Sequence, residues 1–378
     1  MKRNFPLHFS SGIYFYLVLC FYLLHTQYVS AQADSTAGSF AMEIAPLYGF
    51  VMAHREALLP LQQQHVTGFE YSLILLSLGR SAWQQTYQYP ETGLTFSALN
   101  LGSPEHLGMG FAVYPFIDFP LQARPKWTMT FRYGIGFGWV EKIFSAESNY
   151  RNAAIGSHLN GVMHFHLQLR QLLTERNELN FGIGITHFSN GSTAIPNLGI
   201  NIPMARIGYK HYFGHPLAFQ KEPIHEQRNF RRYSAYAGAA IKKIYPPLGK
   251  NYFAGVISFM RLQEMSAKSA WGIGADLFYD ASIAPRFQRE GQDSSGIAKN
   301  FREGIFGAIH FSLGKAGLMF NMGYYLHTSW KEDGNFYHRI CVRYYLQKLF
   351  FCMNLKTHYA RADFIEWGIG WRFGKKGK

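Results

Sequence analysis

Beyond its first 31 residues, the 378-residue sequence lacks any run of roughly 20 apolar residues, the length that a membrane-spanning helix needs. It is also poor in charge, because Asp, Glu, Lys and Arg make up only 16% of the chain, and it has only three cysteines. These shortages exclude a helical membrane protein. They leave room for a single disulfide, between Cys341 and Cys352 on strands that we expect to be neighbours across a hairpin.

The first 31 residues have the composition of a cleavable secretory signal. A basic start is followed by the apolar run 13–24, and residues 29–31 form a small-x-small pattern typical of a cleavage site. No small residue stands just before Cys20, which argues against a lipoprotein anchor. We therefore expect a signal peptide over residues 1–31 and a mature chain that begins near Gln32.

The chain is short of acidic residues relative to basic ones. With 37 Lys and Arg against 23 Asp and Glu, the formal net charge is +14, and loss of Lys2 and Arg3 with the signal would leave +12 (14 − 2). A basic surface suits nucleic acid, an anionic membrane face or a phosphorylated lipid. Export argues against nucleic acid, so lipid is the expected partner.

Aromatic residues and glycine are what the chain has in abundance. Aromatics make up 17% of it and there are 37 glycines. In the stretch 158–173, apolar and polar residues alternate, as a barrel wall between lipid and a hydrated lumen requires. The apolar set is Met163, Phe165, Leu167 and Leu169, and the polar set is His164, His166, Gln168 and Arg170. This pattern predicts an all-β, antiparallel outer-membrane barrel.

Similar runs recur along the whole chain. We count about eight before residue 213 and about eight after residue 233, separated at 214–232 by a stretch in which charge and proline accumulate and alternation lapses. The expected domains are therefore a first barrel over 32–213, a linker or long loop over 214–232, and a second barrel-like half over 233–378. Two small barrels and one larger barrel of about 16 strands remain alternatives.

The ends of the two halves resemble each other. Residues 357–360 (Thr-His-Tyr-Ala) echo 186–189 (Thr-His-Phe-Ser), and 369–371 echo 207–209. From the Thr to the Ile there are 21 positions in the first copy (207 − 186) and 12 in the second (369 − 357). We interpret the second half as a degenerate repeat that has Ala360 in place of the serine and a loop nine residues shorter.

Strand parity singles out one polar pair. Because successive residues of a strand face opposite sides, His187 and Ser189 continue the lipid-facing row. That row consists of Leu179, Phe181, Ile183 and Ile185. A polar group facing hydrocarbon is a functional hypothesis by default. The alternative is that both side chains lie among lipid headgroups and bind water. His164 and His166 lie in a polar row, where hydrogen bonding in the lumen is favoured over metal binding.

The spacing of the pair fits nucleophilic catalysis. Residues i and i+2 on one strand face lie roughly 6 to 7 Å apart, so an imidazole could take the proton of Ser189. Asn201 has the outward parity of the next strand and could orient His187. The loop between these strands supplies Asn197 and glycines, which could contact an oxyanion.

These residues carry a family resemblance. "HFSN" at 187–190, followed by Pro196-Asn197 and Gly199-Ile200, resembles the outer-membrane lipid A 3-O-deacylase family (PagL-type acyloxyacyl hydrolases), over about residues 40–213. The family's members are eight-stranded barrels with an outward-facing serine esterase site. By position, the resemblance implies the following roles: Ser189 as nucleophile, His187 as base, Asn201 in place of the acidic triad member, and Asn197, with Asn190 and Gly191, at the oxyanion or substrate. An amide at 201 can orient an imidazole but cannot stabilise imidazolium by charge.

The sequence thus predicts an outer-membrane serine esterase of a Gram-negative bacterium. It would remove an ester-linked acyl chain from lipid A or a related lipopolysaccharide glycolipid, at the level of the outer leaflet and with neither cofactor nor metal. Two alternatives remain: a non-catalytic barrel that acts as a channel or surface anchor, and an outer-membrane phospholipase.

Overall fold

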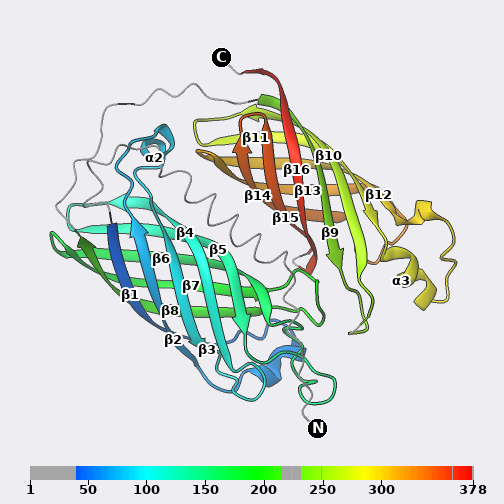
Figure 1. The fold of residues 1–378 in the computed structure, drawn as a ribbon, viewed down its shortest axis with the longest axis horizontal. Coiled ribbons are helices and arrows are strands. Elements are labelled where there is room, and N and C mark those ends of the chain that lie inside the picture. Colours follow the sequence, from blue (N-terminus) through cyan, green and yellow to red (C-terminus); the bar gives the residue numbers. More distant parts are fainter. Residues whose placement is uncertain (1–39, 214–222, 224–230, 248, 360, 377–378) are drawn as a thin grey trace, which may run out of the picture.

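The computed structural model describes residues 40–213, 223, 231–247, 249–359 and 361–376, and these form two closed β-barrels of eight antiparallel strands each (Figure 1). The predicted signal peptide, 1–31, lies outside the described residues, as does most of the predicted linker, 214–232. None of the helices within the described ranges is both long and apolar enough to cross a membrane.

The elements follow one another with short connections. The first barrel consists of β1 (Phe40–Gly49), β2 (Val66–Leu75), β3 (Glu91–Asn100), β4 (Met109–Ala123), β5 (Trp127–Val140), β6 (Leu159–Thr174), β7 (Asn177–Ser189) and β8 (Ile200–Phe213). The second consists of β9 (Arg231–Lys242), β10 (Tyr252–Glu264), β11 (Ser269–Asp280), β12 (Phe301–Leu313), β13 (Ala316–Thr328), β14 (Phe336–Leu346), β15 (Leu349–His358) and β16 (Arg361–Lys376). The helical segments are η1 (Glu56–Leu61), α2 (Ala82–Thr86), α3 (Ile283–Arg289) and η2 (Ile297–Asn300).

Each barrel closes on itself. β1 pairs with β8, with Phe40 opposite Phe213, and β9 pairs with β16, with Tyr233 opposite Phe373. The predicted all-β, antiparallel barrel is therefore confirmed. Of its two alternatives, the chain forms two eight-stranded barrels and not one barrel of sixteen strands.

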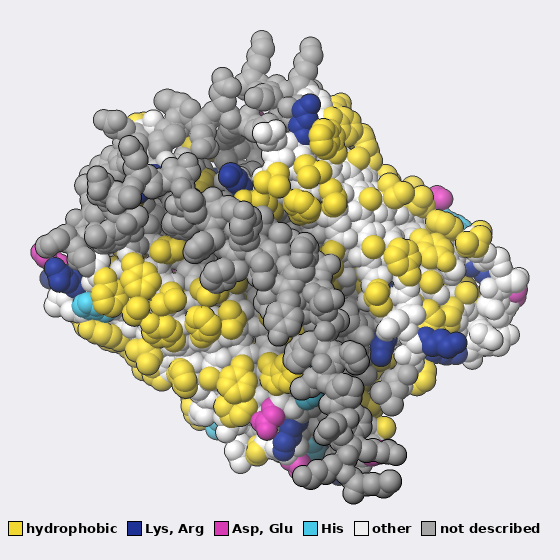
Figure 2. Space-filling view, in the orientation of Figure 1, with side chains coloured by type: hydrophobic (Ala, Val, Ile, Leu, Met, Phe, Trp, Pro, Cys, Tyr) yellow, Lys and Arg dark blue, Asp and Glu magenta, His cyan; other side chains and the backbone are white. Residues whose placement is uncertain are grey.

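Alternation along the strands divides the side chains between two environments. Apolar side chains cover the outside of both barrels (Figure 2). On β7 and β8, for example, Ile183 is 67% exposed and Ile207 is 53% exposed, while their neighbours Thr186 and Arg206 are buried. An apolar outer wall around polar inward side chains is the pattern expected for a barrel in lipid.

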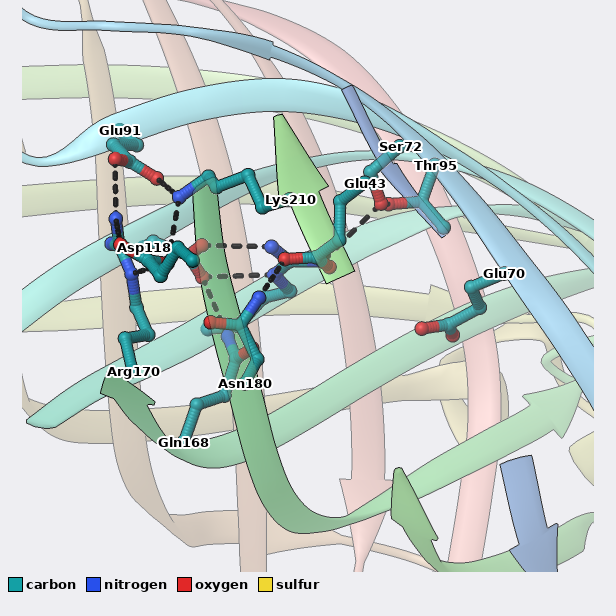
Figure 3. A network of polar contacts seen from close by, with 12 residues as sticks. Glu43, Glu70, Ser72, Glu91, Thr95, Asp118, Gln168, Arg170, Asn180 and Lys210 are labelled. Carbon is teal, nitrogen blue, oxygen red and sulfur yellow. Dashed lines mark hydrogen bonds and ion pairs between the residues drawn. The ribbon is translucent and has the colours of Figure 1, made fainter. Parts of the chain in front are cut away.

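Side chains fill both lumens. In the first barrel an ion-pair network spans several strands (Figure 3), and in it Arg170 Nε lies 2.7 Å from Glu178 and Lys210 Nζ lies 2.7 Å from Glu91. In the second barrel, Lys242 Nζ lies 3.0 Å from Asp280. An eight-stranded barrel is just wide enough for such side chains to pack across it. The pairing supplies these buried charges with partners.

We name the two ends of the barrels by their connections. The loop end carries the connections 50–65, 101–108, 141–158 and 190–199 of the first barrel, and 243–251, 281–300, 329–335 and the link between β15 and β16 of the second. The turn end carries the other connections, including α2 between β2 and β3, together with the start of β1 and the end of β16.

The barrels contact each other at both ends. At the turn end, the Tyr87 hydroxyl donates to the Lys268 carbonyl at 3.2 Å. At the loop end, the Lys243 N–H donates to the Ser192 carbonyl at 2.7 Å, and the Ser192 hydroxyl donates to the Ala362 carbonyl at 3.0 Å. The loop ends of the two barrels are therefore adjacent, as are their turn ends, so the two barrels have the same orientation.

Cys341 and Cys352 face the lumen of the second barrel from the neighbouring strands β14 and β15. Both are buried free thiols, with their Sγ atoms 2.7 Å apart. The disulfide between them stays a prediction.

Candidate active site

The loop end of β7 carries the predicted polar pair on the outer wall. Thr186 and Phe188 point inward, and Phe188 is fully buried in the apolar cluster that fills the loop end of the first barrel. Because the strand stays regular to Ser189, this inward anchor directs His187 and Ser189 outward, as strand parity predicts.

His187 is held by the facing strand. His187 and Asn201 are directly opposite in the β7–β8 register, and His187 Nδ1 lies 2.6 Å from Asn201 Oδ1. A carbonyl oxygen only accepts, so Nδ1 is the protonated nitrogen, and Nε2 is left with a lone pair. Gly199, with φ of +80°, lies against the ring: a Cβ there would come 2.6 Å from His187 Cε1. A bulkier residue would displace the imidazole.

A second histidine, which sequence reasoning missed, extends this chain of contacts. Asn201 Nδ2 lies 3.0 Å from Nδ1 of His54, in the connection between β1 and β2. The Asn201 amide thus lies between two imidazoles, with its oxygen toward His187 and its nitrogen toward His54. No spacing rule links residues 54 and 201, because only closure of the barrel brings β1 beside β8.

Ser189 lies among amide donors. Asn197 Nδ2 donates to Ser189 Oγ at 3.1 Å, and the Gly191 N–H approaches the same oxygen at 3.4 Å. Within the residues that the structure describes, Ser189 makes no hydrogen bond with His187. Catalytic hydrogen bonds are often long or unformed without substrate and tighten in the complex.

Asn190 has a supporting position. Its buried side chain donates from Nδ2 to the Ser157 hydroxyl at 2.8 Å, and its backbone N–H donates to Asn197 Oδ1 at 3.0 Å. The first contact is with the connection 141–158 and the second is within the 190–199 loop, so the donors that remain nearest to the Ser189 hydroxyl are the Gly191 N–H and the Asn197 amide.

The far half of the 190–199 loop rests on its own barrel. The Gly199 N–H donates to the Ala154 carbonyl at 3.0 Å, and a Cβ on Gly156 would come 2.8 Å from the Ile195 carbonyl carbon. The connection 141–158 therefore packs against the 190–199 loop and supports it. Sequence reasoning gave this connection no role, since most of these contacts are made by its backbone atoms and the Ser157 side chain alone marks it.

An apolar groove of about 660 Å³ begins directly beside the polar residues on the outer wall. Ile185 and Pro203 are the next outward residues after His187 and Asn201 toward the membrane centre, and both line the groove. Its other outward lining residues include Tyr48, Phe165, Ile183 and Ala205. A polar site at the head of an apolar groove suits a ligand with a polar head and a hydrocarbon tail.

The echo of the site in the second barrel has a different geometry. β15 keeps a regular alternation in which Phe350, Cys352, Asn354 and Lys356 are buried. His358 continues this inward row, and its Nε2 lies 2.8 Å from the Tyr325 hydroxyl. Ala360 lies outside the described residues. The second barrel thus repeats the dipeptide without repeating the outward-facing imidazole.

The other histidines that the sequence singled out are inward. His164 and His166 are buried, and His164 Nδ1 lies 2.8 Å from the Thr186 hydroxyl. Across the described part of the chain, no group of three His, Cys, Asp or Glu side chains is placed to hold a metal ion.

Comparison with known proteins matches both barrels to family models. Residues 68–210 match the model described as lipid A 3-O-deacylase (PagL), and residues 231–376 match the model described as acyloxyacyl hydrolase, C-terminal domain. No curated protein matches the chain.

Solved outer-membrane barrels are similar at low identity. The crystal structure of the outer membrane enzyme PagL matches at 18% identity over 46% of this chain and 99% of that one, with a TM-score of 0.31. Neisserial surface protein A matches at 5% identity over 47% and 97%, also with a TM-score of 0.31. A mutant of the Rh. blastica porin matches at 6% identity over 88% and 100%, with a TM-score of 0.19.

Proposed function

Because the match of residues 68–210 confirms the resemblance of the first barrel to the lipid A 3-O-deacylase family, we propose that this protein is an outer-membrane serine esterase. Its substrate would be lipid A or a related lipopolysaccharide glycolipid, from which it removes one ester-linked acyl chain. The second barrel, matched by the C-terminal domain model, belongs to the same chain but has no outward-facing histidine at the equivalent position.

One observation carries the proposal: a serine, a histidine and an orienting amide meet on the lipid-facing wall, at the head of an apolar groove. A lumenal site would serve a soluble substrate. An outward site can receive an acyl chain directly from the membrane, with the chain lying along the groove and its ester beside Ser189.

The proposed reaction begins when the Ser189 hydroxyl rotates from Asn197 toward His187. Nε2 takes the hydroxyl proton while Oγ attacks the ester carbonyl. The Gly191 N–H and the Asn197 amide donate to the oxyanion that forms. His187 then gives the proton to the departing sugar oxygen, and a water molecule, activated by the same imidazole, hydrolyses the acyl-enzyme.

We place the loop end at the outer leaflet. The first strand of the first barrel starts, and the last strand of the second barrel ends, at the turn end. If the turn end faces the periplasm, Ser189 reaches the depth at which the acyl esters of outer-leaflet lipid A lie.

The alternatives differ in what supports them. Buried ion pairs fill both lumens, which argues against a channel. A phospholipase would use the same residues on a different headgroup, and assays that compare purified lipid A with phosphatidylethanolamine separate these two enzymes.

The test is mass spectrometry of lipid A from cells that express the wild-type protein or the Ser189→Ala variant at matched outer-membrane levels. We expect lipid A to lose the mass of one acyl chain only in cells with the wild-type protein. Identical spectra from the two strains would contradict the proposal.

A further inference from the structure

We propose that the second barrel positions the catalytic loop of the first. This inference rests on the proposed function, because it gives the second barrel a part in the same reaction. We call residues 190–199 the site loop. Its first half contacts the second barrel at Gly191 and Ser192 and the first barrel at Asn190. The contacts of its second half, among the described residues, are with the first barrel.

Ser192 is the main point of attachment. Its carbonyl accepts a hydrogen bond from the Lys243 N–H at 2.7 Å, and its hydroxyl donates to the Ala362 carbonyl at 3.0 Å. Lys243 follows β9 and Ala362 lies at the start of β16, so both partners come from the closing seam of the second barrel. No partner for either group of Ser192 is supplied by the first barrel within the described residues.

Ile365 supplies the packing contact. A Cβ built on Gly191 would come 2.4 Å from Ile365 Cγ1, so the glycine backbone lies directly against this side chain. Ile365 belongs to the outward row of β16 that continues with Trp367 and Ile369, both of them exposed, while Ile365 itself is half-buried. The site loop therefore covers the part of this row nearest the loop end.

The backbone of the attached half needs such support. Gly191 and Ser192 are consecutive left-handed residues, with φ of +61° and +66°. This conformation is easy for glycine and unfavourable for serine. Contacts with the second barrel hold Ser192 in it, and the N–H of the adjacent Gly191 lies 3.4 Å from Ser189 Oγ. Release of Ser192 would displace the proposed oxyanion donor.

This arrangement predicts a specific kinetic effect. The apolar groove is built from the first barrel's own wall, on β5 to β8 and β1, and it does not include the attached half of the site loop. Loss of the second-barrel contacts should therefore lower kcat and leave KM for lipid A nearly unchanged, because a misplaced oxyanion donor weakens the transition state more than substrate binding.

The experiment uses the full chain with three single changes: Ser192→Ala, Ile365→Ala and, as a matched control, Ile369→Ala. Ile369 lies on the same strand and the same outward face but is 52% exposed. We expect Ser192→Ala and Ile365→Ala each to lower kcat about tenfold, on the scale that small displacements of catalytic groups produce. Ile369→Ala should match the wild type, and all variants should keep the heat-modifiable gel mobility of folded barrels.

A second variant tests the attachment itself. The double change Ser192→Cys with Ala362→Cys, in a Cys341→Ser, Cys352→Ser background, should form a disulfide that replaces the lost hydrogen bond. Activity should be high when this disulfide is oxidised and should fall on reduction. Wild-type kcat in both Ser192→Ala and Ile365→Ala would overturn the inference.

Hydrogen exchange separates this inference from the proposed function. The amides of Gly191 and Thr193 should exchange faster in Ile365→Ala than in the wild type, while the Gly199 amide, bound to Ala154, stays protected. If the wild type hydrolyses no lipid A but this difference is found, the proposed function fails and the attachment stands. Unchanged exchange would overturn the attachment, whatever the activity.

Discussion

The seventh strands of the two barrels, β7 and β15, both carry a Thr-His pair near the loop end, but the two histidines face opposite sides. β7 is regular, so His187 lies on the outer wall, next to the groove. β15 is also regular, but His358 falls on its inward row, after Asn354 and Lys356, so it lies in the lumen. The connections that follow also differ, since 190–199 has ten residues and carries amide donors, whereas only two residues separate β15 from β16. The position of the histidine in the inward–outward alternation of its strand, and not the dipeptide itself, decides whether the imidazole lies on the outer wall.

The largest loss of deacylation rate should come from substitution of Ser189, which has no equivalent in the described part of the second barrel. We expect Ser189→Ala to lower deacylation of lipid A by more than about 10³-fold, because it removes the proposed nucleophile. The measurement is the initial rate of fatty-acid release by purified protein in detergent. Ser148→Ala, an exposed serine in the connection 141–158, is the control and should keep the wild-type rate.

The next effect should come from the base. His187→Ala should reduce the rate by roughly 10²- to 10⁴-fold, the usual contribution of a general base. Stability should change little, because His187 is at the barrel surface and its ring is not part of the apolar cluster. Unfolding in urea, followed by tryptophan fluorescence, checks that point. A rate equal to that of the wild type would mean that His187 and Ser189 are a polar pair of the headgroup region.

Much of this arrangement could be predicted from the sequence, because period-two alternation reports the faces of a strand directly. Parity placed His187, Ser189 and Asn201 on the outer wall, and the structure brings His187 and Asn201 into hydrogen-bond contact. The strand count and the antiparallel barrel followed from the same alternation. The number of barrels did not, because alternation is identical in one large barrel and two small ones.

What the sequence missed depends on contacts between distant segments. His54 reaches Asn201 only because β1 closes against β8. The 141–158 connection supports the site loop mainly through backbone atoms, which any residue type supplies, together with the Ser157 hydroxyl. The bulge in β16, where Asp363 is the extra residue, was also invisible, since a single extra residue leaves the surrounding pattern almost unchanged. The inward position of His358 follows the alternation of β15, and the echo of residues 186–189 hid it because the Thr-His pair falls there with the opposite parity.

Substitution of Asn201 should change the rate of deacylation less than substitution of Ser189 or His187, and should raise it. Asn201→Asp keeps an acceptor for His187 Nδ1 and adds a charge that stabilises the imidazolium, so the rate should rise, by up to about tenfold. Steady-state kinetics with lipid A measures it. A lower rate would indicate that the Asn201 amide is needed as a donor to His54. In that case His54→Ala should reproduce the loss.

The smallest effect on activity should come from His358, the counterpart of His187 in the other barrel. His358→Ala should leave the rate of deacylation unchanged, because His358 lies in the lumen and points away from the site loop. It should instead lower the free energy of unfolding by about 1–3 kcal/mol, since the buried Tyr325 hydroxyl loses the shorter of its two hydrogen bonds and keeps only the 3.5 Å contact with Arg302. Urea unfolding of the purified variant measures this. A His358→Ala variant with normal stability and a reduced rate of deacylation would contradict this prediction. It would mean that the second barrel influences the reaction through its interior as well as through its contacts with Ser192.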